Sequence, residues 1–258
     1  MSKIAVMAFS GGMDSTGLLV HLLAKDYEVH TLSYDYGQKH KLELERAKAN
    51  IQYLSDNDIQ VSQKIVDLQS AMSVFHSALT TENYEIPEGH YEEEQMKQTV
   101  VPNRNAIFAS ILYGYALSIA LKKNKKVKIA LGVHSGDHEI YPDCRPEFYE
   151  ALENAFKIGN WESDKLAFYL PYLEGNKETI LRDAEDSLEK LNLNFETIFA
   201  NTNTSYNPDE QGRSSGKSGA DIERILAFNA IGRKAVSYTH LRAHETDSYL
   251  VCRLLLEK

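Results

Sequence analysis

Cysteine is scarce in this sequence, and basic residues are fewer than acidic ones. Cys144 and Cys252 are the only cysteines among 258 residues, too few for a disulfide framework or a cysteine-built zinc site. Lysine and arginine (28) are outnumbered by aspartate and glutamate (37), which gives a formal net charge of −9 and disfavours non-specific binding to nucleic acid or a membrane surface. We see no run approaching the roughly 20 apolar residues of a membrane span, and no secretory signal. We therefore expect a cytoplasmic protein without nucleic-acid or membrane partners.

What the chain does contain is an ordinary supply of core-forming residues, arranged as alternating strands and helices. Hydrophobic residues make up 43% and charged residues 25%, as in a folded protein. Short apolar runs predict strands, and apolar residues at helical spacing predict helices. The expected strands are 4–9, 29–34, 61–66 and 127–132, and the expected helices are 15–24, 41–54, 104–121 and 146–158. This alternation predicts an α/β fold, with an open, mostly parallel sheet and helices on both faces.

The chain divides into three expected parts. Residues 1–200 form the α/β domain, residues 201–235 a polar, glycine-rich loop with a helix appended to it, and residues 236–258 an atypical tail. We assign no function to the tail because it resembles translated adaptor sequence; a short genuine helix over 249–256 is the alternative. Residues 77–99 are acidic and aperiodic, which favours a solvated loop over a lid that covers a cleft.

The segment SGGMDS, residues 10–15, lies between the first expected strand and the first expected helix. Gly11 and Gly12 allow a tight turn close to an anion, and the N–H groups and dipole of the following helix favour negative charge there. Ser10 and Ser15 add hydroxyl donors. Asp14 would repel a phosphate unless a cation lies between them, which indicates a Mg²⁺ site. The segment is neither a Walker A loop nor a dinucleotide fingerprint, and a turn that binds nothing is the alternative.

Further polar residues follow expected strands or open expected helices. Ligands of open parallel sheets bind at the carboxyl ends of the strands, so segments 34–40 and 132–137 are candidate sites. Arg104 could clamp a phosphate or carboxylate with its guanidinium group. Asp137 could hold Mg²⁺ or a purine-like N–H edge, or could simply cap a helix. Tyr36 and Tyr141 could stack on a heterocycle, although burial is the more common use of tyrosine.

Five segments, taken in order, resemble one known family. SGGMDS is similar to the pyrophosphate loop SGGxDS of the N-type ATP pyrophosphatases. The segments YDYGQKH (34–40), VPNRN (101–105), GVHSGD (132–137) and YPDCRPEF (141–148) then follow in the order and spacing of the preQ0 (7-cyano-7-deazaguanine) synthases. The resemblance spans about residues 3–235.

This resemblance implies a carbon–nitrogen ligase that depends on ATP and Mg²⁺, adenylates 7-carboxy-7-deazaguanine and lets an amine displace AMP. It implies a homodimer. The residue types themselves favour structural roles for His40, one of nine histidines, and for Cys144, a small residue beside a turn; an acid or base role for His40 and a thioester role for Cys144 are the alternatives. The implied catalytic residues are Asp14, which is also the Mg²⁺ ligand, Arg104, Lys177 and Asp137. The implied nucleotide contacts are Ser10, Gly11, Gly12, Asp14, Ser15, Tyr36, Gly37, Gln38 and Gly132. The implied substrate contacts are Arg104, Asn105, Asp137, Tyr141, Asp143 and Arg145. For Lys177, a solvated position at a helix start is the alternative.

One region departs from the family pattern, in which four cysteines hold a zinc ion near the C-terminus. Ser205, Ser215, Ser218 and Asp221 occupy those four positions here, while Arg224 is kept. Serine hydroxyls are weak zinc ligands, and a single carboxylate cannot hold the ion. We therefore predict that zinc is absent and that hydrogen bonds among the hydroxyls hold the loop instead.

Because these four positions differ from the family pattern, we keep alternatives for the amine that accepts the activated carboxylate. Free ammonia, with a nitrile or amide product, is the acceptor that queuosine biosynthesis implies. Similar proteins of bacterial anti-phage (CBASS-like) operons would instead modify the N-terminal amine of a protein. A silent nucleotide-binding subunit is a third possibility, which the retained Ser10, Asp14, Ser15 and Arg104 disfavour. The net charge of −9 and the missing cysteine pairs disfavour a tRNA-thiolating relative.

Overall fold

The apolar runs of the sequence form a five-stranded sheet in the computed structural model. All strands are parallel, in the order β3-β2-β1-β4-β5. The strands are β1 (Lys3–Ala8), β2 (Tyr27–Asp35), β3 (Ser62–Asp67), β4 (Val127–Ala130) and β5 (Leu166–Tyr169). The helices are α1 (Met13–Ala24), α2 (Leu42–Asp56), α3 (Gln69–Met72), α4 (Arg104–Lys123), α5 (Pro146–Gly159), α6 (Lys177–Leu191), α7 (Phe195–Ala200) and α8 (Gly219–Ala230), with 3-10 turns η3 (Pro142–Cys144) and η4 (Ser163–Lys165). The structure describes residues 3–38, 42–75, 77, 100–134, 141–202, 213, 214, 216 and 218–235.

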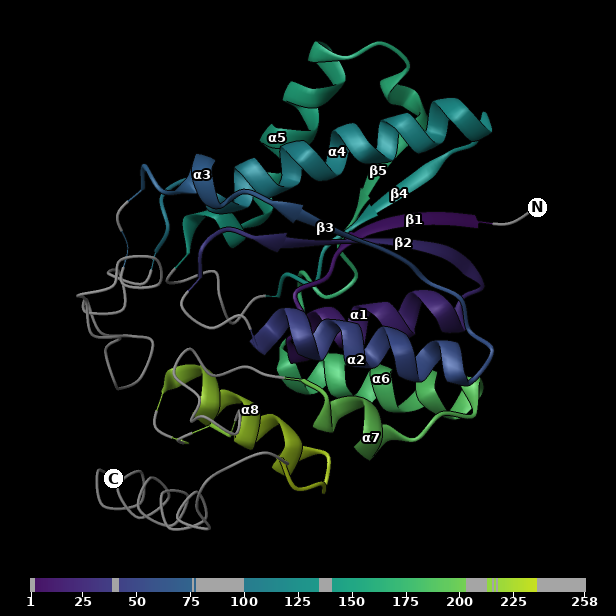
Figure 1. Cartoon of the computed structure of the whole chain (residues 1–258), viewed down its shortest axis with the longest axis vertical. Helices are drawn as coiled ribbons and strands as arrows, with labels where there is room; N and C mark the ends of the chain where they lie inside the picture. Colours follow the sequence, from purple (N-terminus) through teal and green to yellow (C-terminus); the bar gives the residue numbers. More distant parts are fainter. Residues whose placement is uncertain are drawn as a thin grey trace.

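Helices cover both faces of this sheet, as the alternating pattern predicted. In Figure 1, α4 and α5 lie on one side of the sheet, and α1, α2, α6 and α7 lie on the other. Side chains of β1 alternate between the two layers: Ile4 and Val6 are buried against α4, and Ala5 and Met7 against α1 and α6. The predicted α/β class is therefore confirmed.

The order of the strands creates a crevice beside β1. The chain runs outward from β1 to β2 and β3, then returns through α4 to β4 on the opposite side of β1. Met7 pairs with Ala130 of β4, and Ala8 with Leu32 of β2. In open α/β sheets ligands bind where the strand order reverses, at the carboxyl ends. Here that point lies between the ends of β1 and β4.

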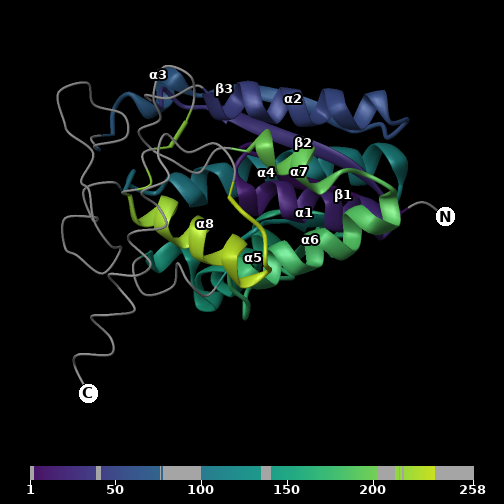
Figure 2. The same cartoon turned by 90° about the horizontal axis from the view of Figure 1, so that it is seen from below.

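Two helices beneath the sheet are packed unusually closely. A Cβ atom on Gly17 of α1 would lie 2.4 Å from Cγ2 of Ile180 on α6, so only glycine fits at this contact. The N-terminus of α6 is fixed by a capping box in which Asn176 and Thr179 bond each other's backbone N–H groups. Helix α8 lies at one end of α6 in both views (Figures 1 and 2), where it contacts the first turns of that helix. Its Phe228 packs on Phe195 and Phe199.

Helix α4 is the one helix, within the described part of the chain, that is long and apolar enough by length and composition to cross a membrane. It contacts β1 and β4, and its Leu112, Ala116 and Ala120 belong to the core on that face of the sheet. The expectation that no segment approaches such a length was therefore wrong for α4. Its packing is that of a core helix.

The eight predicted elements are all present, with bounds within two residues of those expected. The pattern did not predict β5, a short edge strand that pairs Val127 with Leu166. Most of segment 77–99 and the whole of 236–258 lie outside the described residues, so the expected loop, its alternative as a lid, and the expected tail stay predictions. The division at residues 200 and 235 stays a prediction as well.

Candidate active site

The turn between β1 and α1 leaves room for an anion. Gly11 has φ +87°, and a Cβ atom there would lie 2.4 Å from the carbonyl oxygen of Glu43. Gly12 is the N-cap of α1 and has no side chain to occupy the first N–H groups of the helix. The Ser15 hydroxyl lies 3.2 Å from that of Ser10 and can donate to the Gly12 carbonyl oxygen. The turn thus presents backbone N–H groups and hydroxyls at a helix start, the arrangement that binds phosphate.

Asp14, in the first turn of α1, has a carboxylate oxygen to which no other described residue donates a hydrogen bond. Its Oδ1 is buried without a hydrogen-bond partner, and its Oδ2 lies 3.9 Å from Nε2 of the buried His134. The end of β4 comes close to this turn, since a Cβ atom on Gly132 would lie 3.1 Å from the Asp14 carbonyl oxygen. A buried carboxylate oxygen is costly unless a donor or cation meets it. The chemistry of this oxygen therefore fits Mg²⁺, which prefers carboxylate ligands.

These residues border a cavity of about 310 Å³ at the carboxyl ends of β1 and β4. Its volume lies at the lower end of the range for small-molecule sites. It is lined by Ala8, Phe9, Ser10, Gly12, Asp14, Ser15, Tyr34, Tyr36, Gln38, Glu43, Leu44, Arg104, Asn105, Phe108, Ala109, Leu131, Gly132, Val133 and Tyr149. The cavity thus lies at the reversal of strand order, where a ligand is expected.

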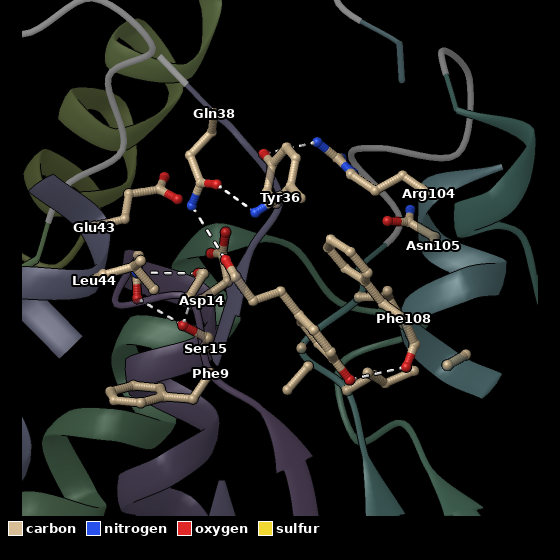
Figure 3. A pocket seen from close by; sticks show the side chains of 18 of the residues that line it. Phe9, Asp14, Ser15, Tyr36, Gln38, Glu43, Leu44, Arg104, Asn105 and Phe108 are labelled. Atoms are coloured by element: carbon tan, nitrogen blue, oxygen red, sulfur yellow. Dashed lines mark hydrogen bonds between the residues drawn. The ribbon is translucent and has the colours of Figure 1, made fainter. Parts of the chain in front are cut away.

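Two helices form opposite sides of the cavity. Figure 3 shows Glu43 and Leu44 of α2 on one side and Arg104 and Asn105 of α4 on the other, with Asp14 between them. The Arg104 guanidinium group lies 5.8 Å from the centre of the Tyr36 ring and donates to its hydroxyl at 3.4 Å. Arg104 is thus an ordered, partly buried cation in the cavity wall rather than an exposed residue at a helix start.

Aromatic rings supply the apolar part of the wall. Tyr34 stacks on Phe108 with ring centres 4.1 Å apart, and its hydroxyl donates to the Phe108 carbonyl oxygen at 2.9 Å. The Tyr36 ring leans on the same phenylalanine at 5.4 Å. Burial raises the pKa of both tyrosines above the ordinary value, so they are neutral. A flat heterocycle would meet uncharged aromatic surface here.

Gln38 and Gly37 determine the course of the backbone after β2, next to the cavity wall. Gln38 accepts the Tyr36 N–H at 2.9 Å and donates to the Tyr34 carbonyl oxygen at 3.2 Å. Gly37 has φ +80° and does not line the cavity. Both residues therefore fix the path of the chain after β2, and Gln38 also borders the cavity.

Glu43 is the cavity carboxylate that the sequence analysis missed. It is partly buried, and burial raises its pKa to about 7, while the positive charge of Arg104 opposes the rise. Its backbone carbonyl oxygen also lies against Gly11. A sequence signal was available, because Glu43 opens the helix that follows the YDYGQKH segment. A carboxyl group that titrates near neutral pH inside a cavity is suited to accept or donate a proton.

The predicted site residues separate into groups. Those that line the cavity are Ser10, Gly12, Asp14, Ser15, Tyr36, Gln38, Gly132, Arg104 and Asn105. Gly11, Gly37, Tyr141, Asp143, Arg145 and Lys177 are described by the structure but are not among the lining residues. Asp137 and His40 lie outside the described residues. The binding roles themselves stay predictions.

The YPDCRPEF segment (141–148) does not line the cavity but supports a residue that does. Cys144 in η3 is buried, and the Asn105 side-chain amide lies 4.0 Å from its sulfur. Arg145 is exposed to solvent, whereas Tyr141 and Asp143 are partly buried. The segment thus backs Asn105 through a small buried thiol, which is the position expected of Cys144.

Lys177 faces a second cavity of about 350 Å³, lined by His134, Asn176, Lys177, Glu178, Glu223, Leu226, Ala227 and Ala230. Its ammonium group donates to Oε2 of Glu223 at 2.5 Å and lies 3.3 Å from Nε2 of His134. Only 8% of Lys177 is exposed, so the alternative of a solvated lysine was wrong. His134 separates Lys177 from Asp14.

Comparisons with known proteins identify the family of this chain. The model of the family described as "Queuosine biosynthesis protein QueC" matches residues 4–232. The chain belongs to the QueC family. Proteins named 7-cyano-7-deazaguanine synthase from Marinomonas sp. and Caldicellulosiruptor saccharolyticus are 42% and 41% identical to it, over 90% and 89% of this chain and 96% and 92% of theirs. Among solved structures, NMN synthetase from Francisella tularensis aligns with a TM-score of 0.40 at 12% identity, over 95% of this chain and 82% of that one.

The structure describes two of the four positions at which the resemblance predicted cysteines, Ser218 and Asp221. Ser218 caps α8 by accepting the Asp221 N–H at 3.2 Å. Asp221 is fully buried and bonds the Ser218 and Ser214 side chains and the Gly216 and Ser218 backbone; burial raises its pKa, and these bonds oppose the rise. Within the described ranges no group of three His, Cys, Asp or Glu could hold a metal ion. Ser205 and Ser215 lie outside those ranges, so the absence of zinc stays a prediction.

Proposed function

We propose that this chain is an ATP-dependent ligase that activates the carboxylate of 7-carboxy-7-deazaguanine by adenylation and transfers it to an amine. Membership of the QueC family and the names of its relatives support this substrate. The observation that carries the proposal is the buried carboxylate oxygen of Asp14 to which no described residue bonds, beside the glycine turn at the reversal of strand order. That oxygen and the free helix N–H groups suit a magnesium-bound pyrophosphate leaving group.

The reaction balances in two steps. A carboxylate oxygen of the substrate attacks the α-phosphorus of ATP, and the bond to the bridging oxygen of the β-phosphate breaks, which releases pyrophosphate. The amine nitrogen then attacks the acyl carbon, loses a proton, and AMP leaves with the former carboxylate oxygen. A second activation, of the amide oxygen, followed by loss of AMP and a proton would give the nitrile.

Each step has residues of this chain suited to it. The N–H groups at the start of α1 and the hydroxyls of Ser10 and Ser15 hold the departing pyrophosphate. Asp14 would hold Mg²⁺, which supplies neutralising charge to the phosphate oxygens when bound. Arg104 orients a phosphate or the substrate carboxylate, and the rings of Tyr36 and Phe108 contact the heterocycle.

Glu43 is the group suited to take the proton of the attacking amine. It lines the same cavity as Arg104, and its pKa of about 7 matches the pH at which such a base works best. Asp14 is assigned to the cation and Asp137 is a predicted contact of the substrate. The proposal includes a homodimeric, cytoplasmic enzyme, as the resemblance to the family implies.

Incubation with ATP, Mg²⁺ and carboxy-deazaguanine tests the proposal. We expect AMP and pyrophosphate to form only when the acid is present, and mass spectrometry to show amide or nitrile when an ammonium salt is added. Benzoate in place of the acid is the control for non-specific hydrolysis. A nucleotide turnover that ignores the acid would contradict the proposal, and product found only on a protein N-terminus would assign the anti-phage acceptor instead of ammonia.

A further inference from the structure

Four polar side chains form a continuous row from the first cavity to the second. The row runs from Asp14 on α1 to His134 after β4, then to Lys177 at the start of α6, and ends at Glu223 on α8. The successive closest distances are 3.9, 3.3 and 2.5 Å. His134 is 1% exposed and Lys177 8% exposed. A helix at the edge of the fold is thereby joined to the carboxylate beside the phosphate-binding turn.

The Lys177–Glu223 pair differs from the surface ion pairs of the same helix. Arg182 and Glu178, one turn further along α6, also pair at 2.9 Å, but their side chains are 55% and 40% exposed. Ion pairs of that kind contribute little because water screens them and ordering two long side chains costs entropy. The side chains of Lys177 and Glu223 are 9% and 22% exposed. An ammonium group in such surroundings needs its partner, because removal of one member leaves a buried charge.

The position of Glu223 depends on how α8 begins. Two residues earlier, the buried Asp221 carboxylate is bonded by the Ser214 and Ser218 side chains and by the Gly216 backbone. Ser218 caps the same helix, and Arg224 donates to the Phe199 carbonyl oxygen at 3.0 Å. These bonds fix the first turn of α8 on α7, and they thereby fix the direction from which Glu223 approaches α6.

We infer that Glu223 is a positioning residue for the nucleotide site: it holds the Lys177 ammonium group beside His134 and Asp14, and the appended helix α8 thereby takes part in catalysis. This inference rests on the proposed function. This inference predicts two effects of removing the Glu223 carboxylate. Loss of the carboxylate frees the ammonium group from its fixed place, which slows the reaction. It also removes a negative charge from the row that ends beside the phosphate-binding turn, which strengthens the binding of the anionic nucleotide.

The test compares Glu223→Gln with Glu178→Gln, a matched change of a neighbouring glutamate. We expect Glu223→Gln to lower kcat about tenfold while the KM and the calorimetric Kd for MgATP fall about threefold. Glu178→Gln should match the wild type in all three. Glu223→Asp, which keeps the charge, should recover part of kcat. Thermal unfolding of each variant establishes that it is folded, and Glu223→Asp replaces Glu223→Gln as the test if the latter unfolds.

A double-variant cycle separates positioning from general support of the fold. If Glu223 acts through Lys177, adding Glu223→Gln to Lys177→Met changes neither kcat nor the Kd for MgATP further. The inference is overturned if Glu223→Gln equals the wild type, or if it lowers kcat equally in both backgrounds. A wild type that binds MgATP without turning over the acid refutes the proposed function alone, since the Kd cycle still decides the inference. A wild type that binds no MgATP refutes both.

Discussion

Two turns rich in serine and glycine open helices in this protein, one before α1 and one before α8. Each places an aspartate in the first turn of its helix, Asp14 and Asp221. Before α1 the N-cap is Gly12, and Oδ1 of Asp14 has no hydrogen-bond partner within the described part of the chain. Before α8 the N-cap is Ser218, whose hydroxyl accepts the Asp221 N–H. The Asp221 carboxylate is bonded by Ser218, Ser214 and the Gly216 backbone, although its Oδ1, like that of Asp14, has no partner within the described residues.

The difference shows that composition alone does not separate a binding turn from a structural one. Both segments contain the residue types that hold anions or cations. What separates them is the surroundings of the aspartate. The turn before α1 places Asp14 and the hydroxyls of Ser10 and Ser15 on the wall of a cavity. The turn before α8 bonds Asp221 through its own serines and backbone and begins a helix that carries Glu223.

The largest expected effect is that of Asp14→Asn. The change keeps the size of the side chain but removes the charge that holds the cation, so we expect kcat/KM to fall on the order of a thousandfold with little change in unfolding free energy. Pyrophosphate release measures the first and urea unfolding the second. If MgATP affinity by calorimetry stays at the wild-type value, the comparison between the two turns loses its basis.

Gly11→Ala should have the next largest effect, on stability. A side chain there requires a left-handed backbone conformation and a 2.4 Å approach to the Glu43 carbonyl oxygen, so we expect a loss on the order of 3 kcal/mol. Gly114→Ala is the matched control: it lies on α4 with open space around it and should gain about 0.5–1 kcal/mol. Urea unfolding curves measure both. Equal stabilities would show that α2 does not press on this turn.

Asp221→Ala tests the turn before α8. It leaves the hydroxyls of Ser214 and Ser218 and the Gly216 N–H without their buried acceptor, so we expect a loss of about 2–3 kcal/mol. Asp186→Ala, at an exposed position of α6, should cost far less. Chelation with EDTA should leave the melting temperature of the wild type unchanged. A fall in the melting temperature on chelation would reveal a structural metal, and this turn would then hold a metal ion as the family pattern predicts.

Glu43→Gln has the smallest expected effect of these changes. It tests whether Glu43, which like Asp221 has a raised pKa, transfers a proton in the reaction. Because the pKa of Glu43 is raised to about 7, the carboxylate form is lost as the pH falls through 7, and the wild-type rate should fall with it. At a fixed concentration of free ammonia, we expect Glu43→Gln to be about tenfold slower at pH about 8 and independent of pH down to about 6. An unchanged pH profile would remove Glu43 from the proton transfer.

The fold and the turn after β1 were predictable from the sequence because both depend on local patterns. Apolar runs and helical spacing located the first three strands and α4, and SGGMDS combines glycine, serine and aspartate within six residues. Glu43 was missed because a lone glutamate at a helix start is usually solvated, and only the packing of α2 on Gly11 brings it into the cavity. The position of Lys177 was missed for a similar reason, since its burial depends on α8, which follows 42 residues later.

The contact between Gly17 and Ile180 has a consequence for the evolution of this site. Helices α1 and α6 carry the phosphate-binding turn and Lys177 at their respective starts, and no side chain larger than hydrogen fits between them at that point. A larger side chain at position 17 would displace Ile180 or the helix that carries it. The spacing between the anion-binding turn and the lysine therefore constrains which residue the chain can carry at position 17.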